Sequence, residues 1–238
     1  MKTRVLILCA AMICLLGMLA CSDNGEAKDK AAENDSTVAT AKKGQPQEVQ
    51  PVGVESDSLV GQRPTIRNKN NTIVTIATDF GNMTLELYRD VAPAHADSFV
   101  ARTKDGFYNG LIFHRLVANF MIQGGDPQGD GTGNAGYFLP AEFSDLPHIE
   151  GTLSMARSRD INSASSQFFI CLKRTRSTAG LDGKYTVFGH LLKGYETLHA
   201  IGELECTANP SNPREISKPT DDVVMRKVYL SDADGNPL

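Results

Sequence analysis

Two short apolar runs with one cation between them contain the residues best suited to chemistry. They lie within residues 111–125, where Arg115 follows the first run and Gln123 belongs to the second. Because side chains alternate along a strand, Met121 and Gln123 are predicted to face one way and Ile122 the other. With large groups on both faces, one face must fill a core while the other forms an apolar surface that carries an amide. The pattern indicates a binding face beside a positive charge.

A second run, residues 165–172, repeats this arrangement further along the chain. Alternation there places Gln167 with Phe169 on one face and Phe168 with Ile170 on the other. Periodicity alone fits equally well with two ordinary core strands that carry glutamines at their edges. The identity of the surrounding residues decides between the two interpretations.

Several short motifs occur in a fixed order between roughly residues 72 and 230. The motifs are Phe113-His114-Arg115, Phe120-Met121-Ile122-Gln123-Gly124-Gly125-Asp126, Gly151-Thr152-Leu153-Ser154-Met155-Ala156, Ser166-Gln167-Phe168-Phe169-Ile170, and Leu181-Asp182-Gly183-Lys184 followed by Val187-Phe188-Gly189. In content and order they closely resemble the cyclophilin family of peptidyl-prolyl cis-trans isomerases. The resemblance implies an enzyme that accelerates X–Pro isomerisation in proline-containing polypeptides and uses no cofactor.

The resemblance also implies a role for particular side chains. Arg115 would be the catalytic cation, and Gln123 would hold the substrate carbonyl side and help to orient Arg115. The remaining substrate-binding residues would grip the proline ring or line the peptide groove; they are Phe120, Met121, Ala156, Arg157, Gln167, Phe169, Leu181 and Tyr185.

Three positions depart from the pattern common in the family. Arg157-Ser158 replaces Asn-Ala, Tyr185 stands where many members have His, and Gly180 stands where many have Trp. The first two are expected to alter peptide preference without removing the reaction, and the third bears on drug binding. One rival function is a non-catalytic peptide-binding module or holdase chaperone on the same fold. Another, a barrel that carries a small apolar ligand, is disfavoured because large inward side chains should fill a small barrel.

The order of predicted elements favours a mainly β domain over residues 72–231, followed by a short C-terminal tail, residues 232–238. A strand at 72–77, a glycine-bearing turn and a second strand form a hairpin. Pro93 begins a helix that Gly106 ends, and a second helix runs from Gly194 to about Leu204. Together with the resemblance, this predicts a closed antiparallel eight-stranded cyclophilin-like barrel capped by two α-helices.

Residues 1–20 have the pattern of a secretion signal, and Cys21 follows small and apolar residues as in the lipobox of bacterial lipoproteins. A plain secretory signal cleaved nearby is the alternative. Residues 22–71 contain no aromatic residue, so residues 21–71 are predicted to be a lipidated cysteine and a disordered tether with a mean span of roughly 40 Å. The protein is therefore expected in the cell envelope, most simply at the outer membrane, facing the periplasm or the surface.

The charge balance does not favour nucleic acid as a partner. Loss of Lys2 and Arg4 with the signal changes the formal net charge from −4 to −6. The membrane is expected to be contacted only through the N-terminal lipid, and the protein is expected to be a monomer.

Two further features, a glycine-rich acidic loop and a pair of cysteines, raise the questions of a metal site and a disulfide. Residues 126–137 resemble a calcium loop but end in Tyr137 instead of glutamate, and the histidines form no pair at metal-ligand spacing. No metal is predicted. An oxidising compartment permits a disulfide between Cys171 and Cys206, but the sequence cannot show the required geometry.

Overall fold

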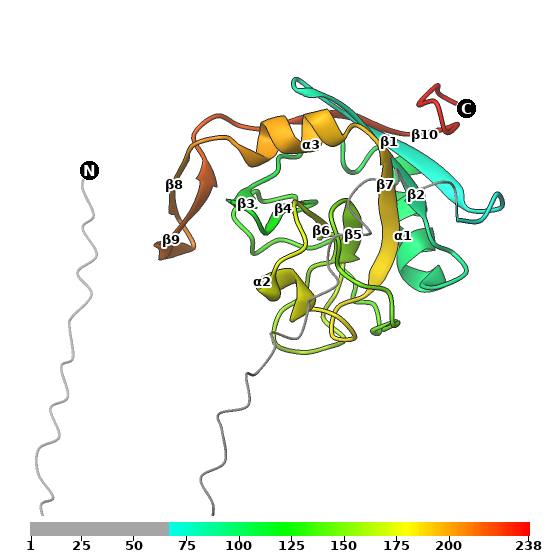
Figure 1. The fold of residues 1–238 in the computed structure, drawn as a ribbon, viewed down its shortest axis with the longest axis horizontal. Coiled ribbons are helices and arrows are strands. Elements are labelled where there is room, and N and C mark those ends of the chain that lie inside the picture. The colour runs from blue at the N-terminus through cyan, green and yellow to red at the C-terminus, as the bar shows by residue number, and fades with distance from the viewer. Residues whose placement is uncertain (1–66) are drawn as a thin grey trace, which may run out of the picture. The chain divides into compact units, whose positions relative to one another are not determined.

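The part of the chain that the structure describes, residues 67–238, is built mainly from β-strands (Figure 1). The structure is a computed structural model, and the predicted signal, Cys21 and nearly all of the tether lie outside the described residues. Eight strands form one antiparallel sheet in the order β10-β1-β2-β7-β5-β6-β4-β3, and β8 and β9 form a separate hairpin. The elements are β1 (Thr72–Thr78), β2 (Gly81–Leu87), α1 (Pro93–Lys104), β3 (Arg115–Val117), β4 (Met121–Gly124), β5 (Thr152–Met155), β6 (Phe168–Cys171), α2 (Arg176–Ala179), β7 (Val187–Lys193), α3 (Tyr195–Gly202), β8 (Cys206–Asn209), β9 (Asn212–Pro219) and β10 (Met225–Ser231).

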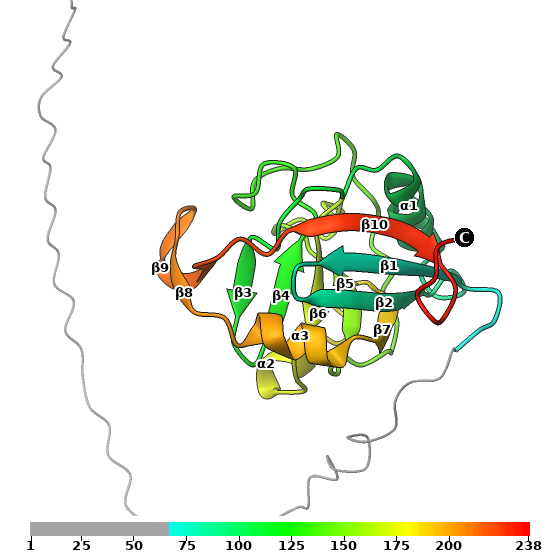
Figure 2. The ribbon, with the colours of Figure 1, turned by 90° about the horizontal axis from the view of Figure 1, so that it is seen from above.

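The eight-stranded sheet is strongly curled but does not close into the predicted barrel. Its two end strands, β3 and β10, are not paired within the described residues. The segment before β3 meets residues 223–225 at the start of β10, through an isolated bridge between Ile112 and Val224 and backbone hydrogen bonds such as the one that the N–H of Met225 donates to the carbonyl of Leu111 at 2.8 Å. The physical reason is that β3 is three residues long and is packed against β9 of the separate hairpin instead of β10 (Figure 2). The expected pairing of β3 with β10 is therefore not formed, and the two edges of the sheet are joined instead over residues 110–113 and 223–225.

The first predicted helix is confirmed as α1, which begins at Pro93. No side chain of the preceding residue caps it. The carboxylate of Glu142 accepts hydrogen bonds from the backbone N–H groups of Ala94 and His95, both at 3.1 Å. These are two of the donors that a helix N-terminus leaves without partners, so a distant loop supplies the cap. Gly106, at φ +71°, allows the turn that follows the helix.

The concave interior of the sheet is filled by side chains. Phe99 of α1 stacks on Tyr108 with ring centroids 4.7 Å apart and meets the ring of Phe168 edge to face at 5.3 Å. Ile122 and Ile170 are fully buried in the same cluster. The predicted alternation of β4 and β6 is thus confirmed on the core side. A filled interior agrees with the enzyme and the peptide-binding interpretations. It does not support a barrel that carries a small apolar ligand inside it.

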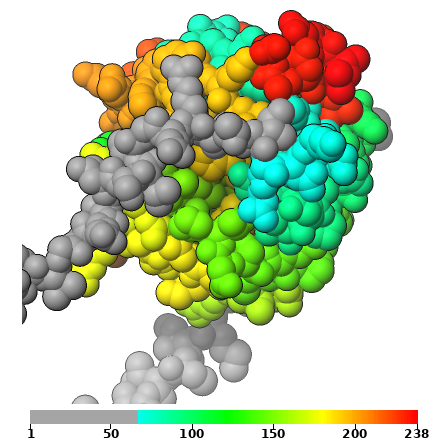
Figure 3. Space-filling view, turned by 45° about the vertical axis from the view of Figure 1, so that its right-hand side comes forward, coloured from blue at the N-terminus to red at the C-terminus, as the bar shows by residue number. Residues whose placement is uncertain are grey.

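The second predicted helix is α3, and it packs on β2 and β4. The one-turn helix α2 and the hairpin β8–β9 were not predicted. Residues after β10 fold back on it, and in the space-filling view this C-terminal segment lies beside the first strands of the domain (Figure 3). Within the described part of the chain, no helix is long and apolar enough to span a membrane. Cys171 and Cys206 are both free thiols.

Candidate active site

The outer face of β4 and β6 forms the floor of a pocket. The two strands pair antiparallel, with Gln123 opposite Phe169 and Met121 opposite Cys171. Met121, Phe169 and Cys171 form a small buried cluster separate from the main core. Because the other faces of these strands fill the main core, the floor is supported from beneath. The backbone register thus places an amide beside an aromatic ring at the surface.

A cavity of about 210 Å³ lies over this floor. It is lined by nine of the ten residues predicted to act on substrate: Arg115, Phe120, Met121, Gln123, Ala156, Arg157, Phe169, Leu181 and Tyr185. Five strands or loops contribute to it. Gln167, the tenth residue, does not line the cavity and lies behind Gln123 as a support.

The guanidinium of Arg115 is held at one edge of the cavity. Arg115 lies opposite Gln123 in the β3–β4 pair, and its Nη1 donates to Oε1 of Gln123 at 3.2 Å. The same nitrogen approaches Sδ of Met121 at 3.8 Å. On the other side, Nε donates to Oε1 of Glu215 at 2.6 Å. The hydrogen bond from Arg115 is the largest cause that lowers the pKa of Glu215, so this carboxylate is ionised at neutral pH.

A chain of amides fixes the orientation of Gln123. Its Nε2 donates to Oε1 of Gln167 at 2.9 Å, and Nε2 of Gln167 donates to the carbonyl of Gly133 at 2.7 Å. The loop that carries Gly133 is itself organised by Asp126, whose carboxylate accepts backbone N–H groups of that loop, including that of Gly131 at 2.6 Å. The residues resembling a calcium loop therefore support the pocket through hydrogen bonds.

The opposite edge of the cavity carries Arg157 and Tyr185, two of the departures from the common pattern. The guanidinium of Arg157 lies 4.5 Å from the centroid of the Tyr185 ring. Tyr185 in turn meets Phe169 edge to face, with centroids 6.0 Å apart. Arg157 also donates to the carbonyl of Lys184 at 3.1 Å. Arg157 and Tyr185 pack against each other. Although both differ from the residues common in the family, they form a continuous wall at this edge of the cavity.

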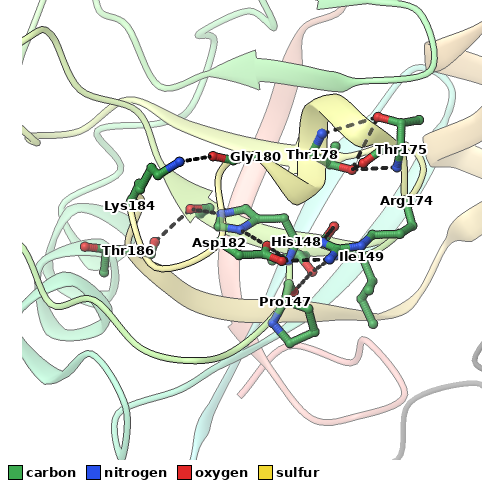
Figure 4. A network of polar contacts seen from close by, with 12 residues as sticks. Pro147, His148, Ile149, Arg174, Thr175, Thr178, Gly180, Asp182, Lys184 and Thr186 are labelled. Atoms are coloured by element: carbon green, nitrogen blue, oxygen red, sulfur yellow. Dashed lines mark hydrogen bonds and ion pairs between the residues drawn. The ribbon is translucent and has the colours of Figure 1, made fainter. Parts of the chain in front are cut away.

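A polar network behind Phe169 was not predicted from the sequence. The His148 ring stacks on Phe169 at 5.9 Å and 16°. The carboxylate of Asp182 accepts the backbone N–H of His148 at 2.8 Å and lies 3.0 Å from its Nδ1 (Figure 4). Arg174 donates to both oxygens of Asp182, at 3.1 and 2.7 Å. The network fixes the back of the aromatic wall.

Sequence reasoning missed Glu215, His148 and Asp182 as members of the site. The motif Leu181-Asp182-Gly183-Lys184 was a usable signal for Asp182, since it places a carboxyl beside a pocket residue. Glu215 is 100 residues from its partner Arg115. No local pattern marks it. Within residues 67–238, no group of three or more His, Cys, Asp or Glu side chains is placed to hold a metal ion.

Together the fold and the site define a class of protein: a curled antiparallel β-domain with a small pocket over Met121 and Phe169 and a fixed cation at its edge. Such a pocket fits a compact ring whose flanking peptide runs past hydrogen-bonding amides. The family model described as "Cyclophilin type peptidyl-prolyl cis-trans isomerase/CLD" matches residues 73–229. The chain belongs to this family and is a cyclophilin-type peptidyl-prolyl cis-trans isomerase.

Known relatives agree with this assignment. A peptidyl-prolyl cis-trans isomerase of Synechococcus elongatus is 45% identical over 118 residues, which cover 50% of this chain and 79% of the relative. Peptidyl-prolyl cis-trans isomerase ppi1 of Schizosaccharomyces pombe is 39% identical over 152 residues, 61% of this chain and 96% of the relative. Some relatives are longer, and the match covers only 27% or 28% of them.

A solved structure shows the same fold. The cyclophilin-type isomerase of Cryptosporidium parvum, crystallised in the presence of the dipeptide Ala-Pro, superposes with a TM-score of 0.59 at 32% identity. The match covers 67% of this chain and 99% of that one.

Proposed function

We propose that this isomerase acts on X–Pro bonds of exported polypeptides, assists their folding, and uses Arg115 as its catalytic cation. The observation that carries the proposal is the cavity over Met121 and Phe169, with Arg115 held at its edge by Gln123. The presence of Ala-Pro in the crystal of the Cryptosporidium parvum relative supports a proline-containing ligand.

The proposed mechanism stabilises a twisted amide without making or breaking a bond. Rotation about X–Pro is slow because the partial double bond sets a barrier of about 18 to 20 kcal/mol. As the bond twists, the proline nitrogen loses conjugation and regains a lone pair. A donor of Arg115 beside that nitrogen then interacts more strongly with the transition state than with the planar ground state. Phe120, Met121 and Phe169 hold the ring in both states, so they contribute mainly to binding.

Gln123 is proposed to hold the substrate carbonyl while it orients Arg115. Its Oε1 accepts from Arg115, and one N–H of its amide donates to Gln167. An amide nitrogen carries two hydrogens, so a second N–H is left to donate to a peptide carbonyl. Because both of its other contacts are fixed, this donor is aimed before the peptide arrives.

Replacement of Arg115 by Ala tests the catalytic role. We expect turnover in a prolyl-peptide assay to fall by on the order of 10² to 10³, comparable to the loss of one preorganised donor. Peptide affinity, measured by titration, should change far less because the pocket floor remains. Circular dichroism would verify the fold. Near-normal turnover by a folded variant would reject the mechanism and favour the peptide-binding module or holdase interpretation.

The exported location and the lipid anchor are proposed from residues 1–21, which lie outside the described residues. The apolar run followed by Cys21 supports removal of a signal and acylation of the thiol. Cys21→Ser should release the protein into the soluble fraction after carbonate washing. A variant that stays with the membrane would contradict the anchor. Protease treatment of whole cells would then distinguish a periplasmic from a surface-exposed domain.

A further inference from the structure

The hairpin β8–β9 places a carboxylate against the catalytic cation. It stands beside β3, as both ribbon views show (Figures 1 and 2). Glu215 of β9 accepts the hydrogen bond from Nε of Arg115 at 2.6 Å. Both side chains are partly buried, with 28% of Arg115 and 29% of Glu215 exposed. The pair is therefore less exposed to solvent than an ordinary surface ion pair, whose contribution is small.

Two acceptors on different strands fix the plane of the guanidinium. Glu215 holds Nε from the hairpin, while Gln123 holds Nη1 from β4. Nη2 of Arg115 makes no hydrogen bond with any other residue in the range 67–238. Since the guanidinium is a rigid planar fork, fixing two of its nitrogens also fixes the direction of the third. The third nitrogen is the one left to meet a substrate.

Glu215 contacts Arg115 from outside the proline pocket. It is absent from the lining of the cavity over Met121 and Phe169. It lines instead a second, polar cavity of about 250 Å³ on the other side of Arg115. Arg115 and Gln123 form the partition between the two cavities. A change at Glu215 should thus reach the reaction through Arg115 and leave the walls that bind the proline ring intact.

We propose that Glu215 is a positioning residue that aims the Arg115 guanidinium at the twisted amide. This inference rests on the proposed catalytic role of Arg115. Without Glu215, Arg115 keeps only contacts made by Nη1, and the fork is free to turn about that one nitrogen. Misplacement of a reacting group by about 1 Å can cost about 10²-fold in rate, so loss of the second contact should lower turnover.

The carboxylate also has an opposing effect, because a negative charge beside Arg115 weakens its attraction for the developing lone pair. The two effects predict different results for two substitutions. Glu215→Gln removes the charge but keeps an oxygen that can accept from Nε. Glu215→Ala removes both. If orientation dominates, Glu215→Gln keeps most of the activity and Glu215→Ala does not. If charge dominates, turnover rises in both variants.

The experiment compares the full-length wild type with these two variants in a prolyl-peptide assay. We expect Glu215→Ala to lower kcat by about 10-fold with KM changed less than about twofold, and Glu215→Gln to stay within about threefold of the wild type. Arg214→Ala is the matched control, since this exposed neighbour on the same strand makes no side-chain hydrogen bond among the described residues. It should behave as the wild type.

A second measurement reports on Arg115 directly. In ¹H–¹⁵N spectra, the Nε–H signal of Arg115, assigned by its loss in Arg115→Ala, should be sharp in the wild type and broadened in Glu215→Ala. Unchanged or increased kcat in a folded Glu215→Ala protein would overturn the inference. The proposed function fails separately, if Arg115→Ala keeps normal turnover or the wild type has none.

Discussion

Asp182 is expected to stabilise the domain by an amount that depends on pH. Its carboxylate joins the backbone of His148, the ring of His148 and the guanidinium of Arg174 (Figure 4). Burial raises the pKa of Asp182, but the hydrogen bonds from Arg174 and His148 outweigh it and lower the pKa to about 2. Asp182→Asn removes the charge while it keeps the size of the side chain.

The magnitude follows from the difference between the ordinary pKa of 3.8 and a value of about 2. At neutral pH this pKa difference contributes at most about 2.5 kcal/mol to the free energy of unfolding, because each pKa unit corresponds to about 1.4 kcal/mol. The side chain is 31% exposed, so solvent screens part of the interaction. We expect Asp182→Asn to lower the free energy of unfolding by about 1 to 2 kcal/mol at pH 7.

The sign of the pH dependence is fixed by the lowered pKa. A carboxyl whose pKa is lower in the folded state contributes fully above its unfolded pKa and loses this contribution as the pH falls toward its folded pKa. The difference between wild type and Asp182→Asn should thus be constant from pH 7 to about pH 5 and shrink between about pH 4 and pH 2.

Urea denaturation at pH 7, 5 and 3 would measure this difference. Asp79→Asn is the matched control, because Asp79 also pairs with two nitrogens of an arginine, Arg226, but both side chains are more than half exposed. The control should show no comparable loss. A loss for Asp182→Asn that is as large at pH 3 as at pH 7 would refute the electrostatic explanation, and no loss at pH 7 would refute the structural role of the network.

Two further predictions concern the pocket and the backbone beside it. Phe169→Ala should raise KM and lower kcat/KM by about 10-fold or more in the prolyl-peptide assay, because it removes pocket wall from ground and transition states alike; an unchanged KM would contradict the role of this ring. Gly125→Ala should cost more than about 2 kcal/mol in chemical denaturation, because φ is +81° and a Cβ would lie 2.3 Å from the carbonyl oxygen of Ser166. Gly110→Ala is the control for backbone strain alone, since φ is +83° there and nothing lies within 4 Å of a Cβ. Equal losses of unfolding free energy at the two glycines would contradict the proposed clash at Gly125.

The floor of the site could be predicted because it depends on local alternation. In β4 and β6, one set of side chains fills the core and the other faces the cavity. The residue types within each strand therefore indicate which face is buried and which lines the site. Register then follows from burial, since a slip of one residue would expose Ile122 and bury Gln123. Motif identity added Arg115 and Leu181, whose positions no periodicity marks.

The hairpin β8–β9 and the open edge of the sheet could not be predicted in the same way. Half of the residues of β9 are exposed, and the strand shows no clear apolar alternation. Its position depends on packing against β3, and β3 is too short to determine its own neighbour. Contacts of this kind join residues far apart in the sequence, and no local pattern specifies them. Glu215 was missed for that reason.

Two separate polar networks support two separate parts of the site. Asp182 fixes His148, whose ring stacks on Phe169, the wall proposed to hold the proline ring in both ground and transition states. Glu215 acts on Arg115, whose proposed interaction is made chiefly in the transition state. Interactions shared by both states affect KM, whereas interactions confined to the transition state affect kcat. The networks share no residue, so one can vary without loss of the other's function. If both proposed roles hold, variation at the hairpin changes turnover while the buried floor keeps its affinity for the proline ring.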